Sequence, residues 1–445
     1  MFKKFEQFMN KHLTPIAQRM DKQHHLSAIK KSMVAMTPIL IIGSLSLMPE
    51  AIGNLTEKAI GANAITSFIT NNMDSLQIPF YLTIGMMGFL VCMCITYFLS
   101  EHYKLYVPGA MSLAAVGFLL MSFNFTEDGG MDIKYMGTKG LFIAMVAGVL
   151  AVELYRWCKK KNFTIRMPES VPDFVSSSFE LIPTTVIIVG VFIGIRIITL
   201  QVFGVLPPEI LTQFLAPLVG SLDNPFTFAF ITFLGITLFF FGIHPSVLSP
   251  ITAPITAQFL AENLEAMAVG QSLPHFYTGG MVSAFANFTG TGVTFGLVFW
   301  YLMSKRVDFK RIGQVSLVQA LFGINAPILF GGPIVLNPTF FLPFVIGGTI
   351  LGTFPAFLMN AGILAKPFFN PPYLGVFIEG FLVNGHWLTP IVQAFQMVGS
   401  ILIWYPFYKM YEKQCDERDT KQVQEIQEES VISPEDLGLL GDLDF

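Results

Sequence analysis

The chain has 445 residues, of which 53% are hydrophobic and 13% are charged, and its formal net charge is −4. A soluble domain carries about a quarter charged residues. This composition excludes an ordinary soluble enzyme and predicts an integral membrane protein. Basic residues form no patch away from the expected membrane flanks, so nucleic acid is excluded as a partner. The four cysteines, at positions 92, 94, 158 and 415, do not form a disulfide framework.

Basic residues recur between apolar ones through the first 31 positions. This alternation predicts an amphipathic helix on the cytoplasmic membrane surface, and no small-residue cleavage site of a signal peptide is found there. A second basic group occupies the loop at 156–166. Because basic loops stay in the cytoplasm, both groups lie inside and an even number of spans separates them. The two groups comprise Lys3, Lys4, Lys11, Arg19, Lys22, Lys30, Lys31, Arg156, Lys159, Lys160, Lys161 and Arg166.

Apolar runs predict the transmembrane spans in chain order. Four spans, at about 32–48, 79–100, 106–123 and 140–157, fit between the two basic groups. A fifth span is predicted at about 179–202, and the mixed segment 201–223 is expected along the outer interface. The later spans are predicted at about 225–241 and about 340–363. Between them, a long helix begins near 287–296 and ends at a third basic group at 305–311, and the last span ends near 408. Residues 412–445 are acidic and predict a solvated, partly disordered tail.

Two apolar stretches are too interrupted by proline and glycine to be ordinary spanning helices. Residues 321–338 read LFGINAPILFGGPIVLNP, and residues 239–255 read FFFGIHPSVLSPITAPI. Irregular backbone at membrane depth is tolerated only where it is buried in protein or lines a wet cavity. Transporters place their substrate sites on such segments, so the two stretches are predicted to form a binding core. The alternative is a pair of proline-kinked helices without a ligand.

Few polar side chains lie in the apolar regions, and these are the candidate site residues. His244 is an ionisable group at membrane depth, which favours a function over a satisfied core histidine. Asn287, Thr289 and Thr291 lie in a glycine-rich run that could bind a polyol or allow close helix packing. Glu379 could bind a sugar hydroxyl or act as a base, or it could end a span at the interface. No metal-ligand cluster, Walker loop or Rossmann fingerprint is present, so no cofactor is predicted.

Several motifs together resemble the lactose/cellobiose family of phosphotransferase-system sugar permeases, the enzyme IIC membrane components. The resemblance covers nearly the whole chain, and its most specific parts are the GIH and PIVLNP motifs. The matching segments, in chain order, are MPESVPDFVSSSFELIP (167–183), FFGIHPSVLSPITAPI (240–255), the glycine and threonine run at 290–296, GINAPILFGGPIVLNP (323–338) and WYPFYKMYEK (404–413).

This resemblance implies an all-α polytopic homodimer in the bacterial cytoplasmic membrane, with about ten transmembrane helices plus two re-entrant hairpins and both termini in the cytoplasm. It implies binding of a β-linked disaccharide or glucoside, whose 6-hydroxyl is phosphorylated by a phosphocysteine on a separate IIB protein. No segment resembles a fused IIB domain. The family histidine matches His244, and the asparagine of the family's NEP motif matches Asn325. Tyr373 is the best match to an aromatic residue that stacks on the sugar.

The predicted organisation has four parts. Residues 1–31 form the cytoplasmic amphipathic helix, and 32–204 form N-terminal transmembrane helices that serve dimerisation. Residues 205–411 form the substrate-binding part with the re-entrant hairpins, and 412–445 form the acidic cytoplasmic tail.

The sequence departs from the family at Ala326, where the NEP motif has a glutamate that contacts the reacting hydroxyl. Alanine can neither accept a hydrogen bond from that hydroxyl nor take its proton. Three interpretations follow. In the first, Glu379 supplies the missing carboxylate. In the second, the protein binds or passes a sugar without phosphorylating it, as a facilitator or a sensor, and in the third the alanine is an engineered substitution. A proton-coupled secondary transporter, using His244 and Glu379, is a further alternative that the family motifs disfavour.

Overall fold

The computed structural model describes residues 23–46, 61–126, 128–163, 173–372 and 374–429, together with single residues at 11, 15, 19, 49, 165 and 168. Most of the amphipathic helix predicted over 1–31, and residues 430–445 of the predicted tail, lie outside the described residues. Residues 412–429 of that tail continue the last helix instead of being irregular. Salt bridges one turn apart, such as Lys409–Glu412, support this extension.

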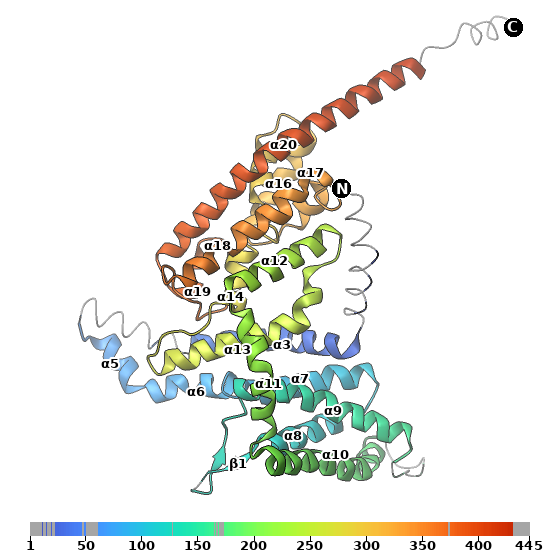
Figure 1. Ribbon diagram of the computed structural model, residues 1–445, viewed down its shortest axis with the longest axis vertical. Helices are drawn as coiled ribbons and strands as arrows, with labels where there is room; N and C mark the ends of the chain where they lie inside the picture. The colour runs from blue at the N-terminus through green and yellow to red at the C-terminus, as the bar shows by residue number, and fades with distance from the viewer. Residues whose placement is uncertain are drawn as a thin grey trace, which may run out of the picture.

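The first half of the chain folds into one end of the elongated molecule, where long helices lie side by side across its long axis (Figure 1). A two-stranded antiparallel hairpin, β1 (Asn124–Phe125) with β2 (Met131–Asp132), projects from this end. The helices here are α3 (His24–Leu45), α5 (Ala64–Asn71), α6 (Met73–Thr83), α7 (Met87–His102), α8 (Val107–Ser122), η2 (Thr138–Gly140), α9 (Leu141–Lys160) and α10 (Asp173–Phe203).

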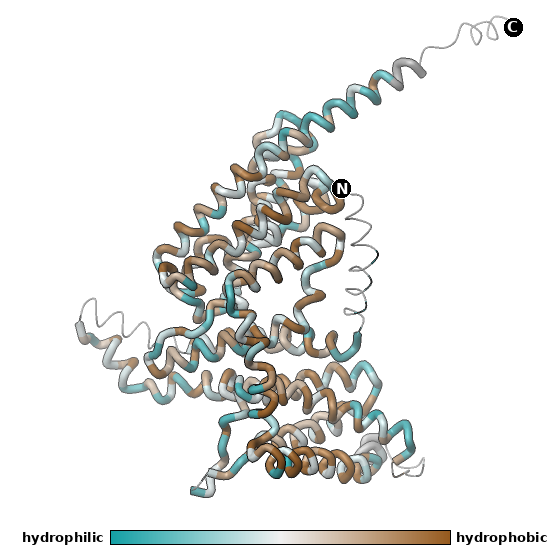
Figure 2. Tube along the Cα trace, viewed as in Figure 1, coloured by the Kyte–Doolittle hydropathy of each residue, from teal (hydrophilic) through white to brown (hydrophobic). Residues whose placement is uncertain are grey.

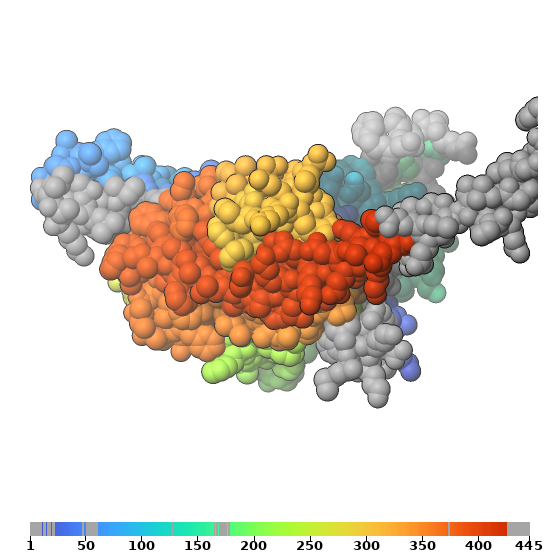
Figure 3. All heavy atoms as spheres, turned by 90° about the horizontal axis from the view of Figure 1, so that it is seen from above, coloured from blue at the N-terminus to red at the C-terminus, as the bar shows by residue number. Residues whose placement is uncertain are grey.

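The second half of the chain forms the other end, and α11 (Pro207–Leu222) runs along the molecule to connect the two (Figure 1). The last helix crosses the outer surface of this half beside the segments around residue 300 (Figure 3). The elements here are α12 (Pro225–Phe240), η3 (Pro245–Leu248), α13 (Ser249–Ala268), α14 (Gly279–Met281), η4 (Val282–Ala286), α15 (Phe295–Met303), α16 (Val307–Leu321), η5 (Pro327–Gly331), α17 (Pro338–Phe341), η6 (Leu342–Gly347), α18 (Gly348–Asn360), α19 (Ile378–Asn384) and α20 (Leu388–Glu429).

Hydrophobic residues predominate along most of the helices, whereas the C-terminal part of α20 is hydrophilic (Figure 2). The stretch Phe179–Phe203 is the most apolar of the long helices and the least buried. A helix that is apolar all round yet exposed is expected to face lipid. Within the described residues, six helices are long and apolar enough to cross a membrane, or seven if α11 and α12, bent by 78°, form one span.

The prediction of an all-α membrane protein is therefore confirmed, while the count of ten spans and the domain boundaries stay predictions. One predicted element is wrong. The long helix expected from near 287–296 is the short helix α15, because Thr289, Gly290, Gly292 and Val293 adopt positive φ angles that no right-handed helix allows. Irregular backbone is observed in both proline-rich stretches, with a 3₁₀ turn after His244 and a π-helical turn at Pro327–Gly331.

A partly buried ionic cluster connects α13 to the bend between α11 and α12. The His275 ring lies between two carboxylates, with Nδ1 3.0 Å from Asp223 and Nε2 2.6 Å from Glu262. Asp223 ends α11, and its second oxygen accepts hydrogen bonds from the backbone N–H groups of Phe276 and Tyr277. Burial alone would lower the pKa of His275, but the two carboxylates outweigh it and raise that pKa from 6.5 to about 9.

This raised pKa predicts a loss of stability at alkaline pH. The imidazolium contributes fully below pH 6.5, and its contribution disappears as the pH rises through about 9, where the two carboxylates face a neutral ring. The contribution is at most about 3 kcal/mol. We expect the unfolding temperature of the detergent-solubilised protein to fall between pH 7 and 10.

His275→Gln should lower the unfolding temperature at pH 7 and remove this fall. His102→Gln, at an exposed histidine, serves as the matched control and should leave the pH profile unchanged. A wild-type profile that is flat from pH 7 to 10 would contradict the assignment.

Candidate functional site

A cavity of about 600 Å³ lies between α3, α12, η3, α13, the segment 277–291 and the loop 370–372. Its volume falls in the range of small-ligand sites. The lining is mixed, with apolar side chains and a set of uncharged polar groups, and none of the described residues that line it is Lys, Arg, Asp or Glu. The polar lining residues are Thr37, Thr232, His244, Ser246, Ser249, Thr252, Thr256, Tyr277, Ser283, Asn287, Thr291 and Asn370.

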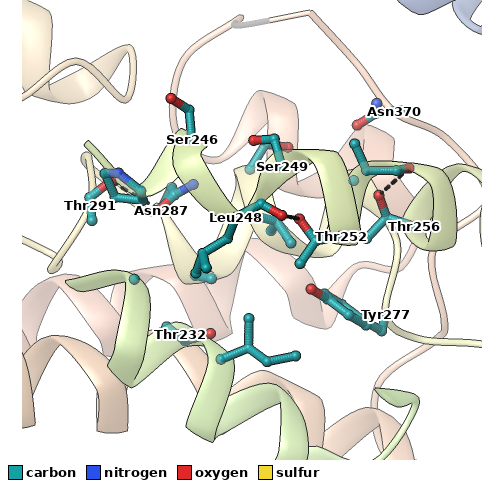
Figure 4. Close-up of a pocket in the computed structure, with 18 of the residues that line it drawn as sticks. Thr232, Ser246, Leu248, Ser249, Thr252, Thr256, Tyr277, Asn287, Thr291 and Asn370 are labelled. Atoms are coloured by element: carbon teal, nitrogen blue, oxygen red, sulfur yellow. Dashed lines mark hydrogen bonds between the residues drawn. The ribbon is translucent and has the colours of Figure 1, made fainter. Parts of the chain in front are cut away.

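One wall of the cavity is a face of α13 that carries three hydroxyls. Ser249, Thr252 and Thr256 follow each other at spacings of three and four residues, which places them on one side of the helix (Figure 4). The Thr252 hydroxyl donates to the Leu248 carbonyl at 3.2 Å, and the Thr256 hydroxyl donates to the Ala253 carbonyl at 3.1 Å. The Tyr277 hydroxyl points toward this wall (Figure 4). Sequence analysis did not select these residues, although the hydroxyl spacing is a signal that could have found them.

His244 lies at one end of the cavity, where α12 stops and the chain turns into η3. Gly242 has a φ of +81°, which lets the backbone leave the helix, and Pro245 begins the next turn. The His244 Nδ1 atom accepts a hydrogen bond from the backbone N–H of Ser246 at 3.2 Å. This bond favours the neutral tautomer with its proton on Nε2. In that form His244 can donate a hydrogen bond to an oxygen in the cavity.

A strained turn at residues 287–293 forms another part of the cavity wall, on the same side as Ser246 (Figure 4). Thr289 and Val293 have φ angles of +57° and +50°, and such values are costly for β-branched side chains. The turn presents Asn287 and Thr291 to the cavity (Figure 4), and the Thr291 hydroxyl donates to the Asn287 side-chain oxygen at 3.2 Å. The π-helical turn η4 leads into it, and such turns are frequent at functional sites.

Buried side chains from other elements hold this turn in its strained form. The Asn325 amide donates to the Thr291 carbonyl at 2.7 Å and to the Thr294 hydroxyl at 3.3 Å. A side chain at Gly290 would begin 2.4 Å from Asn325, so only glycine fits there. From α20, the Ser400 hydroxyl donates to the Val293 carbonyl at 2.6 Å. The turn is therefore fixed from two sides before any ligand binds.

Glu379 lines a small, separate cavity of about 10 Å³, which adjoins the part of the large cavity lined by Ser283 and Asn287. Ser283 and Asn287 line both cavities and separate the carboxyl group from the large one. The Glu379 side chain is only 6% exposed, and its Oε1 atom has no hydrogen-bond partner among the described residues. The Ser283 hydroxyl, next to this cavity, donates to the Gly280 carbonyl at 3.3 Å. A buried carboxyl group with an unused acceptor is costly and marks a functional candidate.

The cavity brings together some of the predicted site residues and leaves others outside. His244, Asn287 and Thr291 line it. Thr289 is buried and donates to the Phe288 carbonyl at 2.6 Å, and Asn325 supports the turn without lining the cavity. Ala326 is exposed and also lies outside the lining. Tyr373 lies outside the described residues, although its neighbours Asn370, Pro371 and Pro372 line the cavity.

A match to one protein family covers most of the chain. The family model "Phosphotransferase system, EIIC" matches residues 30–348. This chain belongs to that family. It is 30% identical to the lichenan permease IIC component of Bacillus subtilis, over 95% of this chain and 97% of that protein. It is 31% identical to the lactose-specific EIICB component of Lactococcus lactis, over 91% of this chain and 72% of that protein.

A solved structure confirms that the EIIC fold extends over almost the whole molecule. The crystal structure of the transporter ChbC, the IIC component of the N,N'-diacetylchitobiose-specific phosphotransferase system, matches with a TM-score of 0.83 and 26% identity. The match covers 93% of this chain and 99% of ChbC. The resemblance inferred from the sequence motifs is thus confirmed, and this EIIC protein is the membrane transport component of a sugar phosphotransferase system.

The support that Asn325 gives to the turn can be tested by Asn325→Ala. Losing a buried hydrogen-bonding group costs about 1–3 kcal/mol, and Asn287 and Thr291 would lose their fixed positions. We expect a lower unfolding temperature and at least tenfold weaker binding of the sugar that the wild-type protein binds best in a panel of β-linked disaccharides.

Asn337→Ala is the matched control, since Asn337 caps α17 by accepting from the Thr339 N–H at 3.1 Å and does not line the cavity. It should lower stability by about 1 kcal/mol without changing sugar affinity. If Asn325→Ala binds sugar as tightly as the wild type, the turn does not need this support.

Proposed function

We propose that this EIIC protein takes up a β-linked disaccharide or glucoside and presents the sugar 6-hydroxyl to a phosphocysteine on a separate IIB protein. The observation that carries this proposal is the uncharged, hydroxyl-rich and amide-rich cavity of about 600 Å³ with His244 at one end. Hydroxyl and amide groups pair with sugar hydroxyls without the desolvation cost of a buried charge. The names of the lichenan and lactose relatives also support a β-linked sugar.

The transfer step requires three events at one hydroxyl group. The hydroxyl oxygen forms a bond to phosphorus, the phosphorus–sulfur bond breaks with its electron pair going to sulfur as a thiolate, and the hydroxyl proton leaves. Holding the hydroxyl in line with the phosphocysteine supplies much of the acceleration. The Nε2–H of His244 orients the hydroxyl or stabilises charge on the phosphoryl oxygens.

The proton acceptor in this proposal is Glu379, with Ser283 as the bridge between it and the cavity. His244 is a poor acceptor in the tautomer that the Ser246 contact favours, because its Nδ1 is already used. Ala326 offers no acceptor at all. The Glu379 carboxyl group has an oxygen without a hydrogen-bond partner among the described residues, and Ser283 and Asn287 lie between it and the large cavity. In the proposed relay the Ser283 hydroxyl turns from the Gly280 carbonyl, takes the proton of the sugar hydroxyl and gives its own proton to Glu379.

Around this site, the proposed protein has about ten transmembrane helices and two re-entrant hairpins, one near His244 and one at 321–338. It is a homodimer in the bacterial inner membrane with both termini in the cytoplasm. Residues 32–204 serve dimerisation, and 205–411 bind the substrate. The basic groups at 156–166 and 305–311 support this orientation.

Reconstituted vesicles supplied with phosphorylated IIB and labelled disaccharide test the function directly. We expect phosphosugar from the wild type and at least a hundredfold slower transfer from Glu379→Gln, with sugar affinity kept within a few-fold. Ala326→Glu in the Glu379→Gln background should restore part of the transfer, because the family motif that this segment resembles has a glutamate at this position.

Three outcomes would overturn parts of this proposal. Unmodified sugar accumulating in the vesicles would favour a facilitator, and binding without flux or transfer would favour a sensor. A large gain from Ala326→Glu in the wild-type background would show that the natural site lacks a working base and that Glu379 does not replace it.

A further inference from the structure

The cavity has the right chemistry for a neutral sugar but not for the phosphate that the reaction adds. Among the residues that the structure describes, its lining includes no Lys or Arg, yet a sugar 6-phosphate and a phosphocysteine are both anionic. Moving such a group into a poorly solvated site without a counter-charge is costly. The proposed function therefore requires a cation close to the end of the cavity where the phosphoryl group arrives.

Lys30 of α3 is a cation that reaches Ser246 on the cavity wall. Its Nζ atom donates a hydrogen bond to the Ser246 hydroxyl at 3.1 Å. Ser246 lines the cavity and is the same residue whose backbone N–H binds His244 Nδ1. In Figure 4 the Ser246 hydroxyl points away from the other labelled hydroxyls. One short segment thus connects a cation, a hydroxyl and the imidazole.

A second cavity links Lys30 to the sugar site along α3. This space, of about 160 Å³, is lined by Lys30 and shares Thr37, Ser249, Thr256 and Asn370 with the large cavity. Lys30 and Thr37 are seven residues apart and so lie on one face of α3, about 10 Å apart along its axis. The ammonium group can therefore lie at the end of a bound sugar while Thr37 lies beside its body.

We propose that Lys30 and Ser246 form the subsite that binds the phosphoryl group, first on the incoming phosphocysteine and then on the 6-phosphosugar product. This inference rests on the proposed function and adds to it a residue from the N-terminal half of the chain. The Lys30 ammonium turns from the Ser246 hydroxyl to the phosphoryl oxygens, and the Ser246 hydroxyl donates a second hydrogen bond. Neutral sugar needs neither group, so the subsite distinguishes product from substrate.

Binding of the product tests the inference. The probes are the disaccharide that the wild type binds best among lactose, cellobiose, β-mannobiose and N,N'-diacetylchitobiose, and its 6-phosphate. Each competes with the labelled disaccharide for the full-length protein in detergent. We expect Lys30→Gln to weaken binding of the 6-phosphate at least tenfold and to change binding of the neutral sugar less than twofold. Lys30→Arg should keep most of the affinity for the 6-phosphate.

Lys31→Gln is the matched control, because Lys31 is the next residue of α3 but lies over the Phe98 ring, 5.8 Å from its centroid. It should leave both affinities unchanged. The contact with the phosphocysteine, the phosphate donor, is tested separately, by measuring how the transfer rate depends on the concentration of phosphorylated IIB. A rise in KM for phosphorylated IIB with Lys30→Gln, but not with Lys31→Gln, assigns the contact to the phosphocysteine as well as to the product.

The outcomes separate this inference from the proposed function. If the wild type transfers phosphate and Lys30→Gln binds the 6-phosphate as tightly as the wild type, the subsite is wrong and the function stands. Equal losses for neutral and phosphorylated sugar would mean that Lys30 only holds η3 in place, which also overturns the subsite. If the wild type binds none of the four sugars, the function and the subsite both fail.

Discussion

The irregular parts of this fold depend on one kind of interaction, the hydrogen bond from a buried side-chain amide to the backbone of a broken segment. Asn263 binds the backbone of His275 and Pro367, and Asn384 binds the backbone of Ala365 and His386. Gln396 donates to the carbonyls of Phe285 and Leu351. Backbone groups that leave a helix in an apolar environment must find such partners. An amide is suited to this task because it donates and accepts without carrying charge.

This arrangement explains how the cavity can be both polar and uncharged. Gln393 donates to the Ala284 carbonyl at 2.9 Å and accepts from the Phe377 N–H at 2.9 Å, joining the π-helical turn to the start of α19. The amides of Asn325, Gln393 and Gln396 support the walls from behind, while hydroxyls and the amides of Asn287 and Asn370 face the cavity. The carboxylates described above lie outside its lining, with Glu379 in the small neighbouring cavity and the His275 cluster at the α11–α12 bend.

Much of the architecture could be predicted from residue patterns, because apolar runs and prolines act locally. The two broken stretches and most spans were located in this way, and His244, Asn287 and Thr291 were selected because polar groups are rare at membrane depth. The position of Asn325 could not be predicted, since its role depends on a contact with Thr291 across 34 residues of sequence. The burial of Thr289 could not be predicted either, because it follows from a positive φ angle in the turn. The long helix predicted after residue 287 does not form, because tertiary contacts impose positive φ angles on four residues of the turn at 287–293.

The lining of α13 has a consequence for what kind of sugar it can accept. The hydroxyl protons of Thr252 and Thr256 are committed to carbonyls of their own helix, so each oxygen presents only lone pairs to the cavity. At these two positions the wall offers acceptors, which are complementary to hydroxyl protons and not to ether oxygens. A ligand that placed methyl ethers there would bury the lone pairs of both threonines without a donor, whereas free hydroxyls would satisfy them.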